Sequence, residues 1–165
     1  MLVRTKESAN VGAAARAMLN FGLTDLWLVA PRCRIDHRAY ALASHAEEVL
    51  KSATVVDELA EALAGRSLVA GTSARPRKAE NYVVRSPRQA ASELGESTAV
   101  LFGPEDHGLS NEELTVCQLH IVIPTLDFSS LNLAQAVLVV AYEAAVAARE
   151  RSGGGSADAA PPPPE

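Results

Sequence analysis

Four polar segments hold the side chains that can do chemistry, at residues 10–16, 71–88, 103–112 and 129–132. Each one adjoins a short apolar run typical of a buried strand, or opens a stretch typical of a helix. In open parallel α/β sheets, ligands bind at the carboxyl ends of the strands. We therefore expect these segments to meet at one edge of a sheet. Each also has a purely structural interpretation, as a turn or as a helix cap.

The first segment offers an amide and a guanidinium, on Asn10 and Arg16. About one and a half helical turns separate them, so we expect both to reach the same side of the helix start. A guanidinium keeps its proton in proteins and binds phosphate or hydroxyl oxygens. The structural alternative is a capping Asn10 and a solvated Arg16. A dinucleotide-binding loop is excluded because the GxGxxG spacing is absent.

The second segment concentrates positive charge in a chain whose net charge is −5. Between residues 75 and 88 only Glu80 is acidic, and the basic residues are Arg75, Arg77, Lys78, Arg85 and Arg88. Such local enrichment is typical of phosphate contacts in nucleic-acid-binding proteins. A solvated loop whose charges serve solubility is the alternative.

The third and fourth segments place polar groups around short turns. Gly103 and Gly108 bracket Glu105 directly after an apolar run, and Ser130 and Asn132 stand before the longest apolar stretch. Helix N-termini attract anionic or electron-rich groups through free N–H donors, although Ser and Asn at that place also cap helices. No ligand spacing around the neighbouring histidine supports a metal site, so none is expected.

Apolar runs alternate with helical patterns along the body of the chain, with short connections between them. This alternation predicts an α/β fold, a parallel sheet flanked by helices on both faces. The expected strands lie at residues 2–4, 26–29, 55–56, 67–72, 99–102 and 121–123. The expected helices lie at residues 13–21, 37–44, 57–64, 87–94 and 111–116, and from Leu133 onward. A turn is expected at residues 8–12.

The chain of 165 residues is long enough for one domain, which we expect at residues 1–151. The Gly/Pro-rich end, residues 152–165, predicts a disordered tail because it cannot bury apolar area. The two cysteines lack the spacing of a zinc site or a disulfide framework, and no signal-peptide pattern opens the sequence. A cytoplasmic setting is therefore expected.

The last helix is apolar on every face except at Gln135 and Glu143, and its cap is expected at Ser130 or Asn132. The two polar interior residues interrupt the run of about 18 apolar residues that a membrane span requires, so we expect no membrane contact. A helix that is apolar all round must be covered on all sides. One side can lie on the sheet, and we expect a second copy of the chain to cover the other.

Three segments together resemble the motifs of the SpoU/TrmH branch of the SPOUT methyltransferases: NVGAAARAMLNFG, LFGPEDHGLSNEEL and IPTLDFSSLNLAQAV. The resemblance covers about residues 2–150. Within that branch, LVAGTSAR, SSLNLAQA and VAYE are most similar to the TrmJ group of tRNA (cytidine/uridine-2′-O)-methyltransferases.

This resemblance implies an α/β domain with a C-terminal deep trefoil knot, a homodimer, and methyl transfer from S-adenosylmethionine to a 2′-oxygen of RNA without a metal. The implied substrate is a nucleotide of the tRNA anticodon loop, at position 32. Pro104 stands where the TrmJ group usually has Arg, and Pro occurs there in the related wobble-position group. The alternatives are the wobble nucleotide, ribosomal RNA, or RNA binding without catalysis.

The resemblance also implies roles for individual residues. The knot loops would bind the cofactor through Thr72, Ser73, Ala74, Gly103, Glu105, Gly108, Ile123, Pro124, Ser130, Leu131 and Asn132. The implied catalytic residues are Asn10, Arg16, Glu105, Ser130 and Asn132. We expect Arg16 to position phosphate and hydroxyl groups rather than to accept a proton. Charge and location make Arg75, Arg77 and Lys78 the candidates for contacts with the RNA backbone.

Overall fold

The computed structural model describes residues 1–74 and 83–153. Every strand pairing within these residues is parallel. A sheet of order β1-β2-β3 is formed by Leu2–Val3, Trp27–Val29 and Thr54–Val56. A sheet of order β5-β7-β4-β6 is formed by Val83–Arg85, Leu119–Val122, Leu68–Ser73 and Thr98–Leu101.

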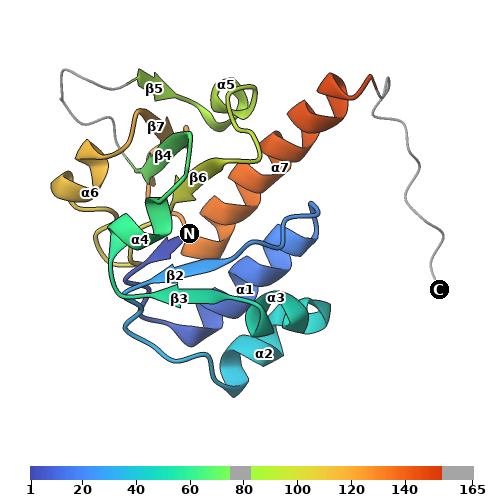
Figure 1. Cartoon of the computed structure of the whole chain (residues 1–165), viewed down its shortest axis with the longest axis vertical. Coiled ribbons are helices and arrows are strands. Elements are labelled where there is room, and N and C mark those ends of the chain that lie inside the picture. The colour runs from blue at the N-terminus through green and yellow to red at the C-terminus, as the bar shows by residue number, and fades with distance from the viewer. Residues whose placement is uncertain (75–82, 154–165) are drawn as a thin grey trace.

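The two sheets meet where β1 lies beside the end of β6. Leu2 forms a parallel bridge with Phe102, and the Val3 N–H donates to the Phe102 carbonyl at 2.8 Å. The strands therefore make one layer in the order β3-β2-β1-β6-β4-β7-β5 (Figure 1). The predicted parallel α/β fold is confirmed, and the short β5 is an addition to the expected strands.

Helices cover both faces of this layer (Figure 1). One core holds side chains from α1 (Ser8–Leu19), α2 (His37–Ala43), the turn η1 (Ser44–Ala46), α3 (Glu47–Lys51), α5 (Pro87–Ala91) and α7 (Leu133–Arg151). The other holds side chains from α4 (Leu59–Leu63) and α6 (Asn111–Thr115). The strands serve both, because Leu2 and Leu28 belong to the first core and Val3 and Val29 to the second.

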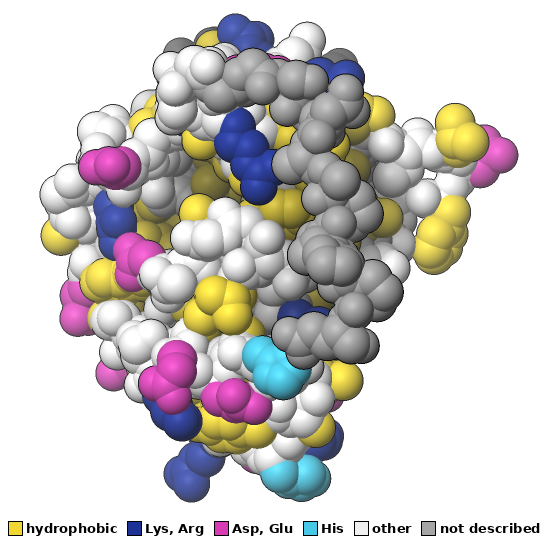
Figure 2. Space-filling view, turned by 90° about the vertical axis from the view of Figure 1, so that its right-hand side faces the viewer, with side chains coloured by type: hydrophobic (Ala, Val, Ile, Leu, Met, Phe, Trp, Pro, Cys, Tyr) yellow, Lys and Arg dark blue, Asp and Glu magenta, His cyan; other side chains and the backbone are white. Residues whose placement is uncertain are grey.

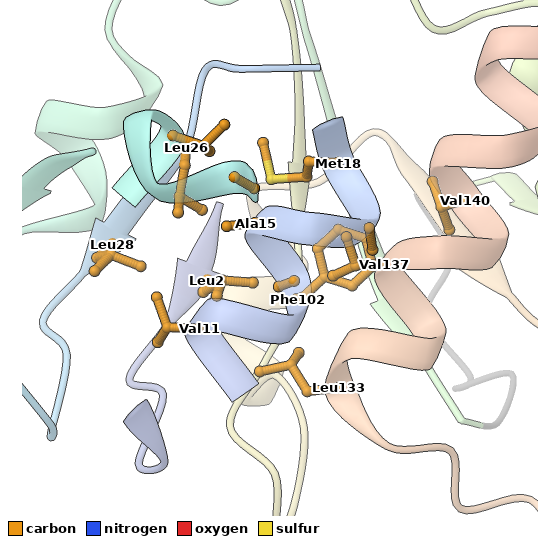
Figure 3. Packing of buried hydrophobic residues seen from close by; sticks show 14 of the residues in the cluster. Leu2, Val11, Ala15, Met18, Leu26, Leu28, Phe102, Leu133, Val137 and Val140 are labelled. Carbon is orange, nitrogen blue, oxygen red and sulfur yellow. The ribbon is translucent and has the colours of Figure 1, made fainter. Parts of the chain in front are cut away.

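Helix α1 lies at the centre of the larger core. Figure 3 shows Val11, Ala15 and Met18 of α1 among side chains from β1, β2 and α7. Phe102, which follows β6, belongs to the same cluster and is 5% exposed. The core therefore fixes α1 and α7 relative to the carboxyl ends of the strands, where the polar segments emerge.

Helix α1 begins at Ser8, so the turn expected at residues 8–12 is wrong. Gly12 suggested a turn, but its lack of a side chain instead allows α1 to pack closely against α2. A Cβ at Gly12 would lie 1.9 Å from the backbone oxygen of Ala39 in α2. Asn10 consequently stands in the first turn of a helix, with its side chain fixed by that geometry.

Helix α7 confirms the expected long C-terminal helix, and Asn132 is its cap. The Asn132 side chain accepts from the Ala134 N–H at 2.8 Å, while the Asn132 N–H donates to Gln135 Oε1 at 3.1 Å. Gln135 is therefore polar because it completes a capping box. No helix in residues 1–74 and 83–153 is long and apolar enough to cross a membrane.

The last strand, β7, lies between two earlier strands, β4 and β5. Helix α7 then packs against α1 and α5, so the chain end crosses the earlier elements. The trefoil knot that the resemblance implies stays a prediction, as do the domain limits at residue 151.

Candidate functional site

A cavity of about 600 Å³ opens at the carboxyl ends of β4, β6 and β7. Its walls come from residues 72–74 at and after the end of β4, residues 102–109 after β6, Ile123 after β7, and residues 129–131, Leu133 and Ala136 around the start of α7. This is the edge at which open parallel sheets bind ligands. Three of the four polar segments therefore meet there.

Most residues of the implied cofactor set line this cavity: Thr72, Ser73, Ala74, Gly103, Glu105, Gly108, Ile123, Ser130 and Leu131. Pro124 and Asn132 adjoin the lining without belonging to it. Their ligand roles stay predictions. The lining also includes residues outside that set: Phe102, Pro104, Asp106, His107, Leu109, Ser129, Leu133 and Ala136.

The Glu105 carboxylate is the hub of the site. Its Oε1 accepts from the Thr5 hydroxyl at 2.9 Å, from Asn10 Nδ2 at 3.0 Å and from the Glu7 N–H at 3.2 Å. Its Oε2 accepts from the Lys6 N–H at 3.0 Å. Glu105 thus accepts from the backbone N–H of Glu7, the N-cap of α1, and from that of Lys6 just before it, so the loop after β6 holds the start of α1.

Asn10 connects this hub to α7. While its Nδ2 donates to Glu105, its Oδ1 accepts from Asn132 Nδ2 at 3.0 Å. The orientations of both side-chain amides are consistent. The Glu105 carboxylate can only accept, so it requires the Nδ2 of Asn10, and the Ala134 N–H can only donate, so it requires the Oδ1 of Asn132. A continuous chain of hydrogen bonds therefore joins the first, third and fourth polar segments.

The carboxylates of this site are held in their charged form. Burial alone would raise the pKa of Glu105, but the hydrogen bonds from Asn10, the Lys6 N–H and Thr5 outweigh it and lower that pKa. The hydrogen bond from the Lys6 ammonium lowers the pKa of the exposed Asp106 to about 2. Because Glu105 already accepts four bonds, it is poorly placed to act as a proton acceptor.

The loop after β6 is folded tightly on itself. A Cβ at Gly103 would lie 2.2 Å from the backbone of Gly108 and Leu109, so only glycine fits there. Gly108 has φ of +69°, and its N–H donates to the Pro104 carbonyl at 3.0 Å. Both glycines are therefore required by the backbone path that forms one wall of the cavity.

The segment that follows β1 clasps this loop, and the sequence interpretation missed it. Arg4 forms a two-pronged ion pair with Glu113 in α6, and Lys6 pairs with Asp106. Thr5 is fully buried with its hydroxyl on Glu105. Three polar residues in a row at the end of a predicted strand were the available signal.

Arg16 lies apart from this cavity. It is exposed on α1 and does not line the cavity of its own chain. Six residues of helix carry it about 9 Å along the axis and about 120° around it from Asn10, so the two side chains point to different sides. Within residues 1–74 and 83–153, no hydrogen bond or ion pair engages its guanidinium. The expectation that Asn10 and Arg16 reach one side of the helix start is therefore wrong.

The proposed RNA-backbone residues Arg75, Arg77 and Lys78 lie outside the described residues. Arg85 and Arg88 are described, and each pairs with an acid: Arg85 with Glu93 at 3.3 Å, and Arg88 with Glu143 at 3.4 Å. In the part of the chain that the structure describes, no group of three His, Cys, Asp or Glu side chains could hold a metal ion.

Together, the fold and the cavity define the class of α/β proteins with an open pocket at the carboxyl ends of parallel strands, the place where such sheets bind ligands. The chain matches the model of the SpoU rRNA Methylase family over residues 1–142. It belongs to that family.

Individual relatives agree with this assignment. The chain is 46% identical over 153 residues to the tRNA (cytidine/uridine-2′-O-)-methyltransferase TrmJ of Escherichia coli K12, covering 89% of this chain and 62% of that protein. TrmJ from Z. mobilis ZM4 matches with a TM-score of 0.82 and 45% identity, covering 87% of this chain and 66% of the other. A structure described as "Structural insights into the 2-OH methylation of C/U34 on tRNA" matches with a TM-score of 0.73 and 27% identity, covering 92% and 94%. The chain thus spans less than two thirds of the length of its curated relatives.

Proposed function

We propose that this protein transfers a methyl group from S-adenosylmethionine to a ribose 2′-hydroxyl of tRNA, at a cytidine or uridine of the anticodon loop, in the cytoplasm. The observation that carries the proposal is the bonded chain Glu105–Asn10–Asn132, whose members are 95 and 122 residues apart in sequence. It joins the three motif segments beside one cavity, whose wall includes Glu105. TrmJ relatives act on cytidine and uridine in tRNA, as their names state.

The cavity has room for a molecule of the size of S-adenosylmethionine. Its volume of about 600 Å³ lies within the range of small-molecule sites. Asp106 on its wall is charged but already pairs with Lys6, so it adds little net charge to the cavity. The folded loop around Gly103 presents backbone rather than side chains to a ligand. When bound, this cofactor supplies an electrophilic methyl group.

The residues of this chain then have the task of holding the two reactants. A neutral hydroxyl is a weak nucleophile, so its alignment with the bond being broken governs the rate. Glu105 holds Asn10, and Asn10 holds Asn132, which fixes the start of α7. Ser130 lies on the cavity wall just before that start. We assign Arg16 the positioning of the ribose and its phosphate.

That role for Arg16 requires a second copy of the chain, because Arg16 does not reach the cavity of its own. The outer side of α7 leaves Leu138 and Tyr142 exposed, and a groove of about 800 Å³ runs between α7 and the end of α1. Figure 2 looks at the side where α1 and α7 reach the surface and shows hydrophobic patches among charged groups. We propose that a homodimer forms over this face and brings Arg16 of one protomer to the cavity of the other.

Mixing two inactive variants tests the composite site. Arg16→Ala keeps an intact cavity, and Asn132→Ala keeps Arg16. If Arg16 acts across the interface, each mixed dimer has one complete site, so random exchange restores about a quarter of the unsubstituted activity. If both residues act within one chain, the mixture stays inactive.

Two measurements on the purified protein test the proposed function itself. Calorimetry should detect saturable binding of S-adenosylmethionine and none of ATP or NAD. Incubation with an unmodified tRNA transcript, followed by digestion and mass spectrometry, should detect a 2′-O-methylated cytidine or uridine in the anticodon loop. Cofactor binding without methyl transfer would favour a noncatalytic RNA-binding homologue. A methylated wobble nucleotide would identify that nucleotide as the substrate instead.

A further inference from the structure

The segment between β7 and α7 carries the two most exposed large hydrophobic side chains of the described residues. Leu126 is 95% exposed and Phe128 is 79% exposed, whereas the next in order, Val55, is 56% exposed. A single exposed apolar residue is ordinary, but two within three residues of chain, beside a cavity, point to a contact surface. Their position decides which contact that is.

This segment forms the lip of the cavity. Ile123 before it and Ser129 and Ser130 after it line the cavity, whereas Leu126 and Phe128 do not. Successive Cα atoms are 3.8 Å apart, so the Cα of Phe128 lies within about 8 Å of that of Ser130. Pro124 and the capped start of α7 hold the two ends of the segment. Phe128 is therefore presented to solvent at the mouth.

We propose that Phe128 stacks on a nucleobase of the RNA substrate, next to the ribose that is methylated, with Leu126 contacting the same base. The inference rests on the proposed function. A ribose can reach a methyl group in the cavity only through the mouth, so a base attached to it or next to it must pass this segment. Stacking on aromatic side chains is the general way in which proteins hold unpaired bases of RNA loops.

Charge favours a base over the sugar-phosphate backbone at this place. Asp127 stands between the two apolar residues and is exposed. A carboxylate repels phosphate, so the backbone of the RNA belongs elsewhere and the aromatic face is left for a base. Each base has a flat π face, so Phe128 accepts cytidine and uridine alike.

Methyl transfer to an unmodified tRNA transcript, measured as kcat and KM, tests the proposal. In Phe128→Ala, kcat/KM for tRNA should fall about 5-fold to 150-fold, the range measured for loss of one base–aromatic stack. Phe128→Tyr should keep the activity, and Phe128→Leu, which keeps apolar area without a π face, should resemble Phe128→Ala. Binding of S-adenosylmethionine should be unchanged in all three. Val55→Ala, a matched loss of exposed apolar surface on β3, should behave as the unsubstituted protein.

A fluorescence titration reads the stack directly. The sequence contains one tryptophan, Trp27, so Phe128→Trp adds one reporter to a constant background. Adding the tRNA transcript should quench the emission of Phe128→Trp more than that of the unsubstituted protein.

Three results would overturn the proposal. Unchanged kcat/KM in Phe128→Ala would show that no base contacts Phe128. A dimer that dissociates in Phe128→Ala, seen by light scattering, would show that the segment binds a second copy of the chain instead. Absence of methyl transfer by the unsubstituted protein would overturn the proposed function, and this inference with it, whatever the variants do.

Discussion

Replacing Glu105 by Gln removes the charge of the hub while keeping its size. The carboxylate accepts four hydrogen bonds, and an amide of the same shape turns a donor toward one of those four donors. Bonds to a charged acceptor contribute roughly 1.5–3 kcal/mol each against about 1 for neutral ones, and a stranded donor costs a further 1–3. Allowing for the partial exposure of Glu105, we expect the free energy of unfolding to fall by about 2 kcal/mol.

Urea unfolding followed by circular dichroism measures this change, with an unchanged dependence on denaturant. The neighbouring Asp106→Asn is the matched control. Asp106 is exposed and pairs with Lys6 at the surface, so its loss should change stability little. Equal effects of the two substitutions would refute the inference that Glu105 holds the start of α1 and Asn10.

The stability difference between the unsubstituted protein and Glu105→Gln should also depend on pH in a definite direction. The folded-state pKa of Glu105 lies below its ordinary value of 4.5. Its contribution is therefore fully present above that value and is lost as the pH falls through the lower folded pKa. The stability difference between the unsubstituted protein and Glu105→Gln should be constant near neutral pH and shrink below pH 4.5.

Three further outcomes are expected. Gly103→Ala should abolish binding of S-adenosylmethionine by calorimetry, because its Cβ would strike the backbone of Gly108, whereas Gly95→Ala, which has open space, should bind normally. Burial, assisted by the Glu113 charge, raises the pKa of Cys117 to about 12, so iodoacetamide should modify this thiol only after unfolding. If iodoacetamide modified Cys117 in the folded protein as fast as it modifies an exposed thiol, the burial of Cys117 would be contradicted. Asn132→Ala should lower the midpoint of thermal unfolding, because it removes a helix cap worth about 1 kcal/mol. It should also weaken binding of S-adenosylmethionine. An unchanged affinity for S-adenosylmethionine would show that Asn132 caps α7 without contributing to the cofactor site.

The alternation of apolar runs and helical patterns predicted the fold because each buried strand is short and flanked by turn residues. It could not predict β5, whose Val83 and Val84 are partly exposed at the sheet edge and carry little strand signal. The sequence interpretation was also wrong in placing Gly12 in a turn. The close approach of α1 to α2 is a tertiary contact, and no local pattern reports it.

Many residues that line the cavity were predictable from the sequence, but their relative geometry was not. Polar side chains at strand ends pointed to a ligand edge, and the family resemblance named Asn10, Glu105 and Asn132. Asn10 bonds to both Glu105 and Asn132 because of the relative position of α1 and α7. The packed core sets that position, so the sequence pattern could not show it. The role that we propose for Arg16 needs a second chain, and a single sequence does not show which residues meet across a contact between two chains.

Nucleoside mass spectrometry of tRNA from cells with and without the gene tests the central claim most directly. If the proposed function is right, one 2′-O-methylated pyrimidine nucleoside of the anticodon loop disappears without the gene, returns with the unsubstituted protein, and stays absent with Arg16→Ala. An unchanged content of every 2′-O-methylnucleoside in tRNA would contradict it.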